Sequence, residues 1–138
     1  MRRKNTIKNP EYYLIGKVKV SVTNIGQCIE KIIEAKEGQS KYICVGNVRT
    51  IVLGNKNKKY QNTINDAFMN LTDGMPLVWA GHLAGAKAIR RTSGPDLFSE
   101  FLKEKYPVKH YLLGDTGETI KTIIDKINKL YPKTIISG

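Results

Sequence analysis

The sequence is poor in cysteine and tryptophan, and it has no long apolar run. Its 138 residues include only two cysteines, Cys28 and Cys44, which are too few for a disulfide framework and lack the CxxC spacing of a zinc site. No apolar run approaches the roughly 18 residues that a membrane-spanning helix needs. Residues 1–5 are basic but lead into a polar stretch and not into an apolar one, so we expect a cytoplasmic protein without a secretory signal.

Acidic residues are also scarce. The chain has 23 Lys and Arg against 12 Asp and Glu, a formal charge of +11. A solvated basic surface explains this excess, but the same field favours nucleic acid, anionic lipid headgroups or the diphosphate of a nucleotide sugar. The sequence has no helix-turn-helix, RNP aromatic motif or GXXG loop, so nucleic acid is an alternative supported by charge alone and we expect none as partner.

What the chain does contain is an ordinary globular composition, with 41% apolar and 25% charged residues. Apolar periodicity predicts strands and helices in alternation. A hairpin is expected over 13–22 and a helix from 25 to about 38, capped by Thr23. The further expected strands are 42–45, 68–72, 110–113 and 134–138, and the further helices are 48–53, 60–67, from 76, from 94, and from 118 to 130.

This order predicts an α/β fold that is Rossmann-like, with a mainly parallel sheet, helices on both faces and a small N-terminal β-hairpin. We expect residues 1–12 to form a basic N-terminal extension and residues 13–138 a single α/β domain. Ligands of such sheets bind beyond the carboxyl ends of strands. Three loops therefore qualify as sites: 46–47, 73–74 and 114–118.

Each candidate residue has a structural interpretation beside the functional one. Asp73 is either a turn residue or a general base. The glycine loop carrying Gly114, Asp115, Thr116 and Gly117 is either a turn or a phosphate-binding helix start. Arg90 and Arg91 form either a solvated pair or a diphosphate clamp. We interpret His82 and His110 as structural, Trp79 as packing and both cysteines as core thiols, and we expect no metal site.

Two motifs carry a resemblance to a known family. Residues 72–80 (TDGMPLVWA) and 91–98 (RTSGPDLF) resemble the paired signature of the WecG/TagA/CpsF family of bacterial glycosyltransferases. That pattern is roughly P-D-G-x-G-V-V-x-A followed by E-R-x-x-G-x-D-L. The flanking hairpin, the Asn47 turn and the glycine loop at 114 are also similar, so the resemblance covers the chain from about residue 14 onward.

The resemblance implies transfer of a hexose or N-acetylhexosamine, as in N-acetylmannosaminyl transfer, from a UDP-sugar to a polyprenyl-diphosphate-linked sugar. It implies an inverting, metal-independent reaction without cofactor, at the cytoplasmic membrane face, in building teichoic acid, enterobacterial common antigen or capsule; a homo-oligomer is possible. Asp73 matches the catalytic aspartate. Asn47, Gly74, Arg91 and Asp96 match positions of the substrate site, and Gly114 to Gly117 would bind the donor.

The chain departs from the family pattern at several positions. Pro76 and Leu77 stand where glycine and valine are usual, Val45 replaces a common threonine, and Arg90 replaces a glutamate. Family members also continue beyond the position of Gly138, so we expect a domain truncated at its C-terminal end. The alternative to a glycosyltransferase is thus a non-catalytic remnant that binds nucleotide sugar or lipid phosphate.

Overall fold

The computed structural model describes residues 11–35, 38, 40–103, 106 and 108–138. The chain forms two compact units, Met1–Gly94 and Pro95–Gly138. Most of the expected N-terminal extension, residues 1–10, lies outside the described residues. The expected division into an extension and a single domain stays a prediction.

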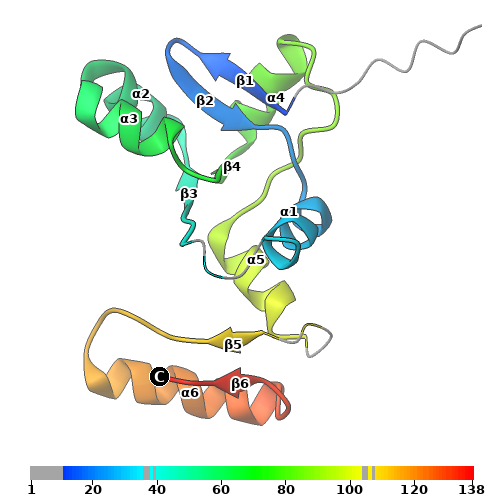
Figure 1. Ribbon diagram of the computed structural model, residues 1–138, viewed down its shortest axis with the longest axis vertical. Coiled ribbons are helices and arrows are strands. Elements are labelled where there is room, and N and C mark those ends of the chain that lie inside the picture. The colour runs from blue at the N-terminus through cyan, green and yellow to red at the C-terminus, as the bar shows by residue number, and fades with distance from the viewer. Residues whose placement is uncertain (1–10, 36–37, 39, 104–105, 107) are drawn as a thin grey trace, which may run out of the picture. The chain divides into compact units, whose positions relative to one another are not determined.

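The first unit opens with the expected hairpin (Figure 1). Strands β1 (Tyr12–Ile15) and β2 (Val18–Ser21) pair antiparallel, and Gly16 provides the positive φ of 63° that the turn requires. Val18 and Val20 are buried while Lys19 between them is exposed. This alternation is the period-two pattern from which the strand was predicted.

Helix α1 (Ile25–Ile33) begins at the predicted residue and ends before the expected end near residue 38. Asn24, and not Thr23, is the N-cap, and its side chain accepts a hydrogen bond from the Gln27 amide. Thr23 is buried, and its carbonyl accepts from the Arg90 amide at 3.0 Å. The cap prediction was therefore wrong by one position, because a contact distant in sequence holds Thr23 in the interior.

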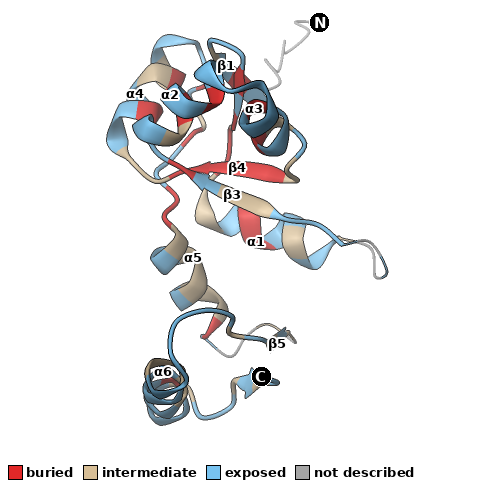
Figure 2. Ribbon diagram, turned by 90° about the vertical axis from the view of Figure 1, so that its left-hand side faces the viewer, coloured by how far each residue is buried: buried red, intermediate tan, exposed pale blue. Residues whose placement is uncertain are grey.

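A parallel strand pair forms the centre of the first unit. Strand β3 (Ile43–Gly46) pairs with β4 (Met69–Thr72), and the two are joined by α2 (Val48–Lys56) and α3 (Lys58–Asn65). The loop predicted between these helices shrinks to Asn57, which ends α2 and caps α3 by accepting from the Tyr60 amide. Every residue of β4 is buried (Figure 2).

The hydrophobic core of this unit joins the hairpin, α2, α3 and α4 (Met75–Leu83). The Tyr13 hydroxyl donates to the carbonyl of Leu77 in α4, and burial raises the pKa of Tyr13 to about 12. Gly54 of α2 allows a close approach, since an added Cβ would lie 2.8 Å from a methyl of Val18. The core thus fixes the start of α4 against the hairpin. Its buried members include Val18, Val20, Val22, Ile51, Ile64, Leu77, Val78 and Ile89.

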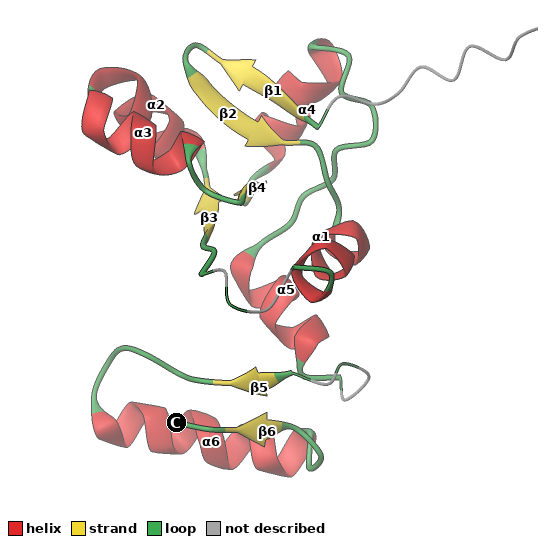
Figure 3. Ribbon diagram, in the orientation of Figure 1, coloured by secondary structure: helices red, strands yellow, loops and turns green. Residues whose placement is uncertain are grey.

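The second unit holds helix α5 (Gly94–Phe101) from Pro95 onward, β5 (Lys109–His110), α6 (Gly117–Leu130) and β6 (Ile135–Ile136) (Figure 3). Strands β5 and β6 are parallel and shorter than predicted. Pairing continues irregularly beyond them, since the Leu112 amide donates to the Gly138 carbonyl at 2.7 Å. Strand–helix–strand order and parallel pairing in both units confirm the α/β class with its N-terminal hairpin.

Candidate active site

Asn47 and Asp73 follow neighbouring parallel strands at the same end of the sheet. The register pairs Gly46 with Thr72, the last residues of β3 and β4. The Asp73 amide then donates to the Gly46 carbonyl at 2.8 Å, which extends the ladder by one step. The structure therefore brings these two predicted site residues to adjacent positions at the carboxyl end of the strand pair.

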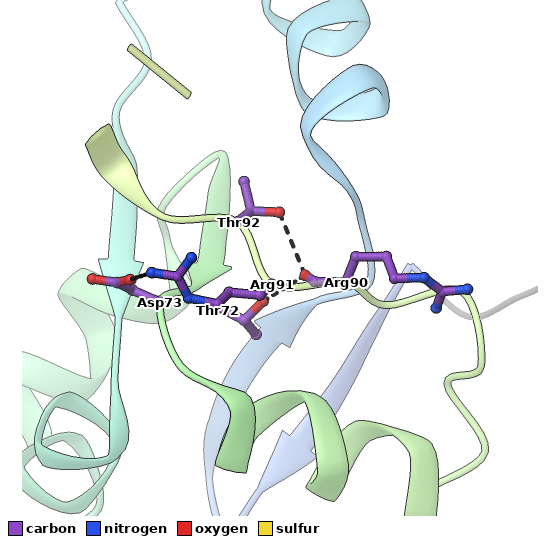
Figure 4. Close-up of polar contacts among 5 residues, drawn as sticks. All are labelled: Thr72, Asp73, Arg90, Arg91 and Thr92. Atoms are coloured by element: carbon purple, nitrogen blue, oxygen red, sulfur yellow. Dashed lines mark hydrogen bonds and ion pairs between the residues drawn. The ribbon is translucent and has the colours of Figure 1, made fainter. Parts of the chain in front are cut away.

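A third segment, residues 90–92, runs along the other side of β4. The Thr92 amide donates to the Thr72 carbonyl at 2.7 Å, and the Thr72 hydroxyl donates to the Arg90 carbonyl at 2.9 Å. Since successive residues of a strand turn their backbone groups to opposite sides, Asp73 bonds toward β3 and Thr72 bonds toward this segment. The Asp73 turn is thus held from both sides, which places Arg91 beside it (Figure 4).

Arg91 forms an ion pair with Asp73. Its Nη2 lies 3.3 Å from Oδ1 of the carboxylate, and the two side chains are 46% and 35% exposed. Exposed pairs of this kind contribute at most about 1 kcal/mol to stability. The pair therefore serves mainly to orient the carboxylate, and it leaves both groups accessible from solvent.

Arg90 does not take part in this pair. Its guanidinium donates to the carbonyls of Lys87 and Ile89, both at 2.8 Å, and points away from Asp73 (Figure 4). The sequence analysis treated the two arginines as a unit, either a solvated pair or a diphosphate clamp, but in the structure their side chains make different contacts. One arginine holds the preceding loop in place, and the other faces the carboxylate.

The Asp73 carboxylate has a second oxygen, Oδ2, with no hydrogen-bond partner in the described part of the chain. The neighbouring helix start is similarly open: Gly74 is the N-cap of α4, and no side chain among the described residues caps it. An uncapped helix N-terminus carries partial positive charge and free N–H donors, although Pro76 in the first turn of α4 supplies none. A negative ligand group beside Asp73 would find these donors there.

The backbone conformation at position 74 does not require a glycine. The φ of 175° at Gly74 is extended, and an added Cβ would meet only the Pro76 ring at 3.7 Å, an ordinary contact.

Asn47 has a structural role, because it caps α2 by accepting a hydrogen bond from the Thr50 amide at 3.2 Å. The amide nitrogen of the exposed Asn47 side chain has no partner among the described residues and remains available to a ligand. The substrate roles of Gly74 and Asn47 stay predictions.

Sequence reasoning missed Asn70, which aligns the strands under the site. Asn70 is 3% exposed, its Nδ2 donates to the Lys19 carbonyl at 2.8 Å, and its amide donates to the Ser21 hydroxyl at 3.0 Å. Its Oδ1 lies where a Cβ on Gly46 would come within 2.7 Å. The available signal was the polar side chain of Asn70 between the apolar residues Met69 and Leu71 of a predicted strand.

The other predicted binding residues belong to the second unit. The loop before α6 has positive φ at Gly114 (129°) and Asp115 (59°). Thr116 caps α6 by accepting from the Thr119 amide, and its own amide donates to Asp115 Oδ1 at 2.7 Å. Asp96 is exposed in the first turn of α5. A common site of these residues with Asp73 stays a prediction.

An open, mostly apolar pocket of about 540 Å³ adjoins this loop. Such hollows suit planar or apolar ligand groups, and the carboxylate of Asp115 supplies a polar edge. Its wall is formed by Phe98, Tyr111, Leu112, Leu113, Gly114, Asp115, Ile120 and Ile123.

Other reactive side chains offer no second site. Burial raises the pKa of Cys28 to about 11, and burial also raises the pKa of Cys44, which disfavours thiolate at neutral pH. Cys28 is a core thiol as expected, whereas Cys44 is only half-buried. Burial lowers the pKa of His110, whose ring packs edge-on against Phe98. In the described ranges no group of three His, Cys, Asp or Glu residues could hold a metal ion.

Comparison with protein-family models gives a match over most of the chain. A family model described as the glycosyl transferase WecG/TagA/CpsF family matches residues 13–138. No curated protein matches the chain. The matched range includes both motifs on which the resemblance was based, and it covers all the candidate residues described above.

Proposed function

Because the chain belongs to the WecG/TagA/CpsF glycosyl transferase family, we propose that it moves a hexose or N-acetylhexosamine from a UDP-sugar to a lipid-linked acceptor. The acceptor would be a sugar hydroxyl on a polyprenyl diphosphate, and Asp73 would be the general base. The observation that carries this proposal is the Asp73 carboxylate itself: one oxygen is fixed by Arg91, and the other has no partner in the described chain.

The reaction needs a base at the incoming hydroxyl. Oδ2 of Asp73 would take the hydroxyl proton while the acceptor oxygen forms its bond to the anomeric carbon of the donor sugar. The bond from that carbon to the diphosphate breaks in the same displacement, and UDP leaves with the electron pair. A single displacement inverts the anomeric centre. Arg91, by holding Oδ1, would keep Oδ2 turned toward the acceptor.

Negative charge on the departing diphosphate has to be stabilised. Arginine binds phosphate oxygens with two parallel hydrogen bonds, and Arg91 keeps nearly half of its side chain exposed. The uncapped N-terminus of α4 adds N–H donors directly after Asp73. These protein groups supply the charge stabilisation by which electrostatic catalysis lowers a barrier, and we propose a metal-independent reaction on that basis.

The donor nucleotide would use the second unit. We assign the uracil and ribose to the pocket beside the glycine loop, where the Tyr111 ring and aliphatic side chains could flank a planar base. The start of α6 at Gly117 could receive a phosphate group, although the Thr116 hydroxyl already occupies one of its amides. Because the acceptor is a lipid, we place the reaction at the cytoplasmic face of a membrane.

A transfer assay tests the proposal. The chain is incubated with membranes that contain polyprenyl-diphosphate-linked sugars and with a panel of labelled UDP-sugars, and the lipid fraction is extracted. We expect label in a lipid product with one donor. Binding of UDP without transfer from any donor would favour the non-catalytic alternative, and absence of both would contradict the proposal.

A further inference from the structure

Helix α4 carries apolar residues on all sides, with His82 as its one polar side chain, but only one side of it is buried. Leu77, Val78 and Gly81 face the core, whereas Met75, Trp79 and Leu83 are 42%, 59% and 91% exposed. Residues four apart lie above one another on a helix, so the exposed three form one row, here called the α4 stripe. The expectation that Trp79 is a packing residue was wrong. Figure 2 shows the exposed side of α4.

The outer face of the 14-residue helix α6 differs from this stripe. A helix of a globular protein usually presents charged and polar side chains to water. Helix α6 follows this rule with Lys121, Asp125 and Lys129, all of which are exposed. The α4 stripe has no charged member and spans about 12 Å at 1.5 Å per residue. An apolar row of this length, including a tryptophan, indicates a surface that meets an apolar partner.

The charges beside the stripe indicate the nature of that partner. No Asp or Glu occurs from residue 74 to residue 95, whereas Lys87, Arg90 and Arg91 fall within this range. Lys87 Nζ donates to the His82 carbonyl at 3.0 Å, which holds an ammonium group at the end of the stripe next to Leu83. Apolar side chains with a cation at one end of the row complement a lipid surface with anionic headgroups.

We propose that the α4 stripe inserts into the headgroup layer of an anionic bilayer, with Lys87 meeting the lipid phosphates. The helix lies in the interface and does not cross it, because its nine residues are about half of what a span requires. In the described residues no helix is long and apolar enough to cross a membrane. Tryptophan suits this position, since its ring is apolar and its N–H is polar.

The stripe begins two residues after Asp73, at the end of β4 that carries the candidate base. A bilayer on the stripe would bring a membrane-embedded substrate to the side of Asp73. This consequence rests on the proposed function. Lipid binding itself does not, and it can be measured without any sugar donor.

The test uses the chain's own reporter, because Trp79 is its only tryptophan. Vesicles of phosphatidylglycerol mixed with phosphatidylcholine are added to the chain, and tryptophan emission is recorded. We expect a shift to shorter wavelength, quenching by lipids brominated near the headgroup, and loss of both at high salt. Vesicles of phosphatidylcholine alone and soluble phosphate should produce neither effect.

Two double variants keep the reporter and test the stripe. Met75→Ser with Leu83→Ser should weaken partition into anionic vesicles by about tenfold. The control is Leu14→Ser with Leu130→Ser, which removes apolar side chains that are 55% and 68% exposed elsewhere and should leave partition unchanged. Circular dichroism checks that both variants are folded. Equal losses in both variants, or no spectral response to anionic vesicles, would overturn the inference.

Two further outcomes would also overturn it. If acrylamide fails to quench Trp79 in the free monomer, the chain covers its own stripe. If the chain sediments as a dimer that Met75→Ser with Leu83→Ser dissociates, a second copy is the partner. Asp73→Asn should bind vesicles as the unaltered chain does, so lipid binding without sugar transfer would contradict the proposed function alone.

Discussion

Two strand-to-helix turns of the molecule, the Asp73 turn and the turn at 114–117, differ in how many of their polar groups find partners within the turn itself. The Asp73 turn follows a buried strand, and within the described chain no side chain caps the helix after it. The turn at 114–117 follows a two-residue strand, and Thr116 caps its helix. Hydrogen bonds with residue 46 and with residues 90–92 hold the first turn, and Oδ2 of Asp73 and the helix N-terminus have no side-chain partner among the described residues. In the second turn, the side chains of Asp115 and Thr116 accept hydrogen bonds from the amides of Thr116 and Thr119. Rigid placement with unused groups is what catalysis needs, which favours the first turn for chemistry and the second for binding.

The largest expected effect is on turnover, when the carboxylate of the Asp73 turn is removed. Asp73→Asn keeps the shape of the side chain but removes its capacity to accept a proton, so turnover should fall by about 10²–10⁴-fold. Binding of UDP, measured by calorimetry, should change little. Asp125→Asn on the exposed face of α6 is the control and should retain turnover. Turnover within a few-fold of normal in Asp73→Asn would make Asp73 a turn residue only.

Substitution of one glycine near each turn, Gly46 and Gly117, compares how tightly the two turns are packed by the change in the free energy of unfolding. An added Cβ at Gly46 would lie 2.7 Å from Oδ1 of Asn70, whose Nδ2 is held by the Lys19 carbonyl. Gly46→Ala should therefore reduce the free energy of unfolding by about 1–3 kcal/mol. At Gly117 nothing lies within 4 Å of an added Cβ, so Gly117→Ala should be neutral or stabilise by up to about 1 kcal/mol. Urea denaturation measures both, and equal losses would show that the Asp73 turn is no more tightly packed.

Arg91 should affect function more than stability. Because its pair with Asp73 is exposed, Arg91→Ala should change the free energy of unfolding by less than about 1 kcal/mol. The apparent KM for the donor or the acceptor should rise about tenfold, since the phosphate contact would be lost. Arg91→Lys should recover part of the affinity by keeping the charge. Steady-state kinetics with each substrate varied in turn decides the matter, and two unchanged KM values would remove Arg91 from the site.

Local sequence patterns were sufficient to predict most helices and strands and the position of the turn that carries Asp73. The alternating valines of β2 and the proline in the first turn of α4 are examples, since each depends on a few neighbouring residues. Patterns could not show that residues 90–92 run beside β4, which is what brings Arg91 to Asp73 across 18 positions. They also could not show which side of the mostly apolar α4 is covered, and for this reason the prediction for Trp79 was wrong.

The smallest expected effect concerns the cap of the second turn. Thr116 Oγ1 accepts from the Thr119 amide at 3.3 Å, and an N-cap threonine typically contributes about 1 kcal/mol. Thr116→Ala should lower the free energy of unfolding by about that amount, and Thr116→Ser should not. If the loop binds the donor, Thr116→Ala should also raise the KM for the UDP-sugar while turnover at saturation stays the same, because a frayed helix start binds phosphate less well. A fall in turnover with unchanged KM would instead place this turn in the chemical step and remove the distinction between the two turns.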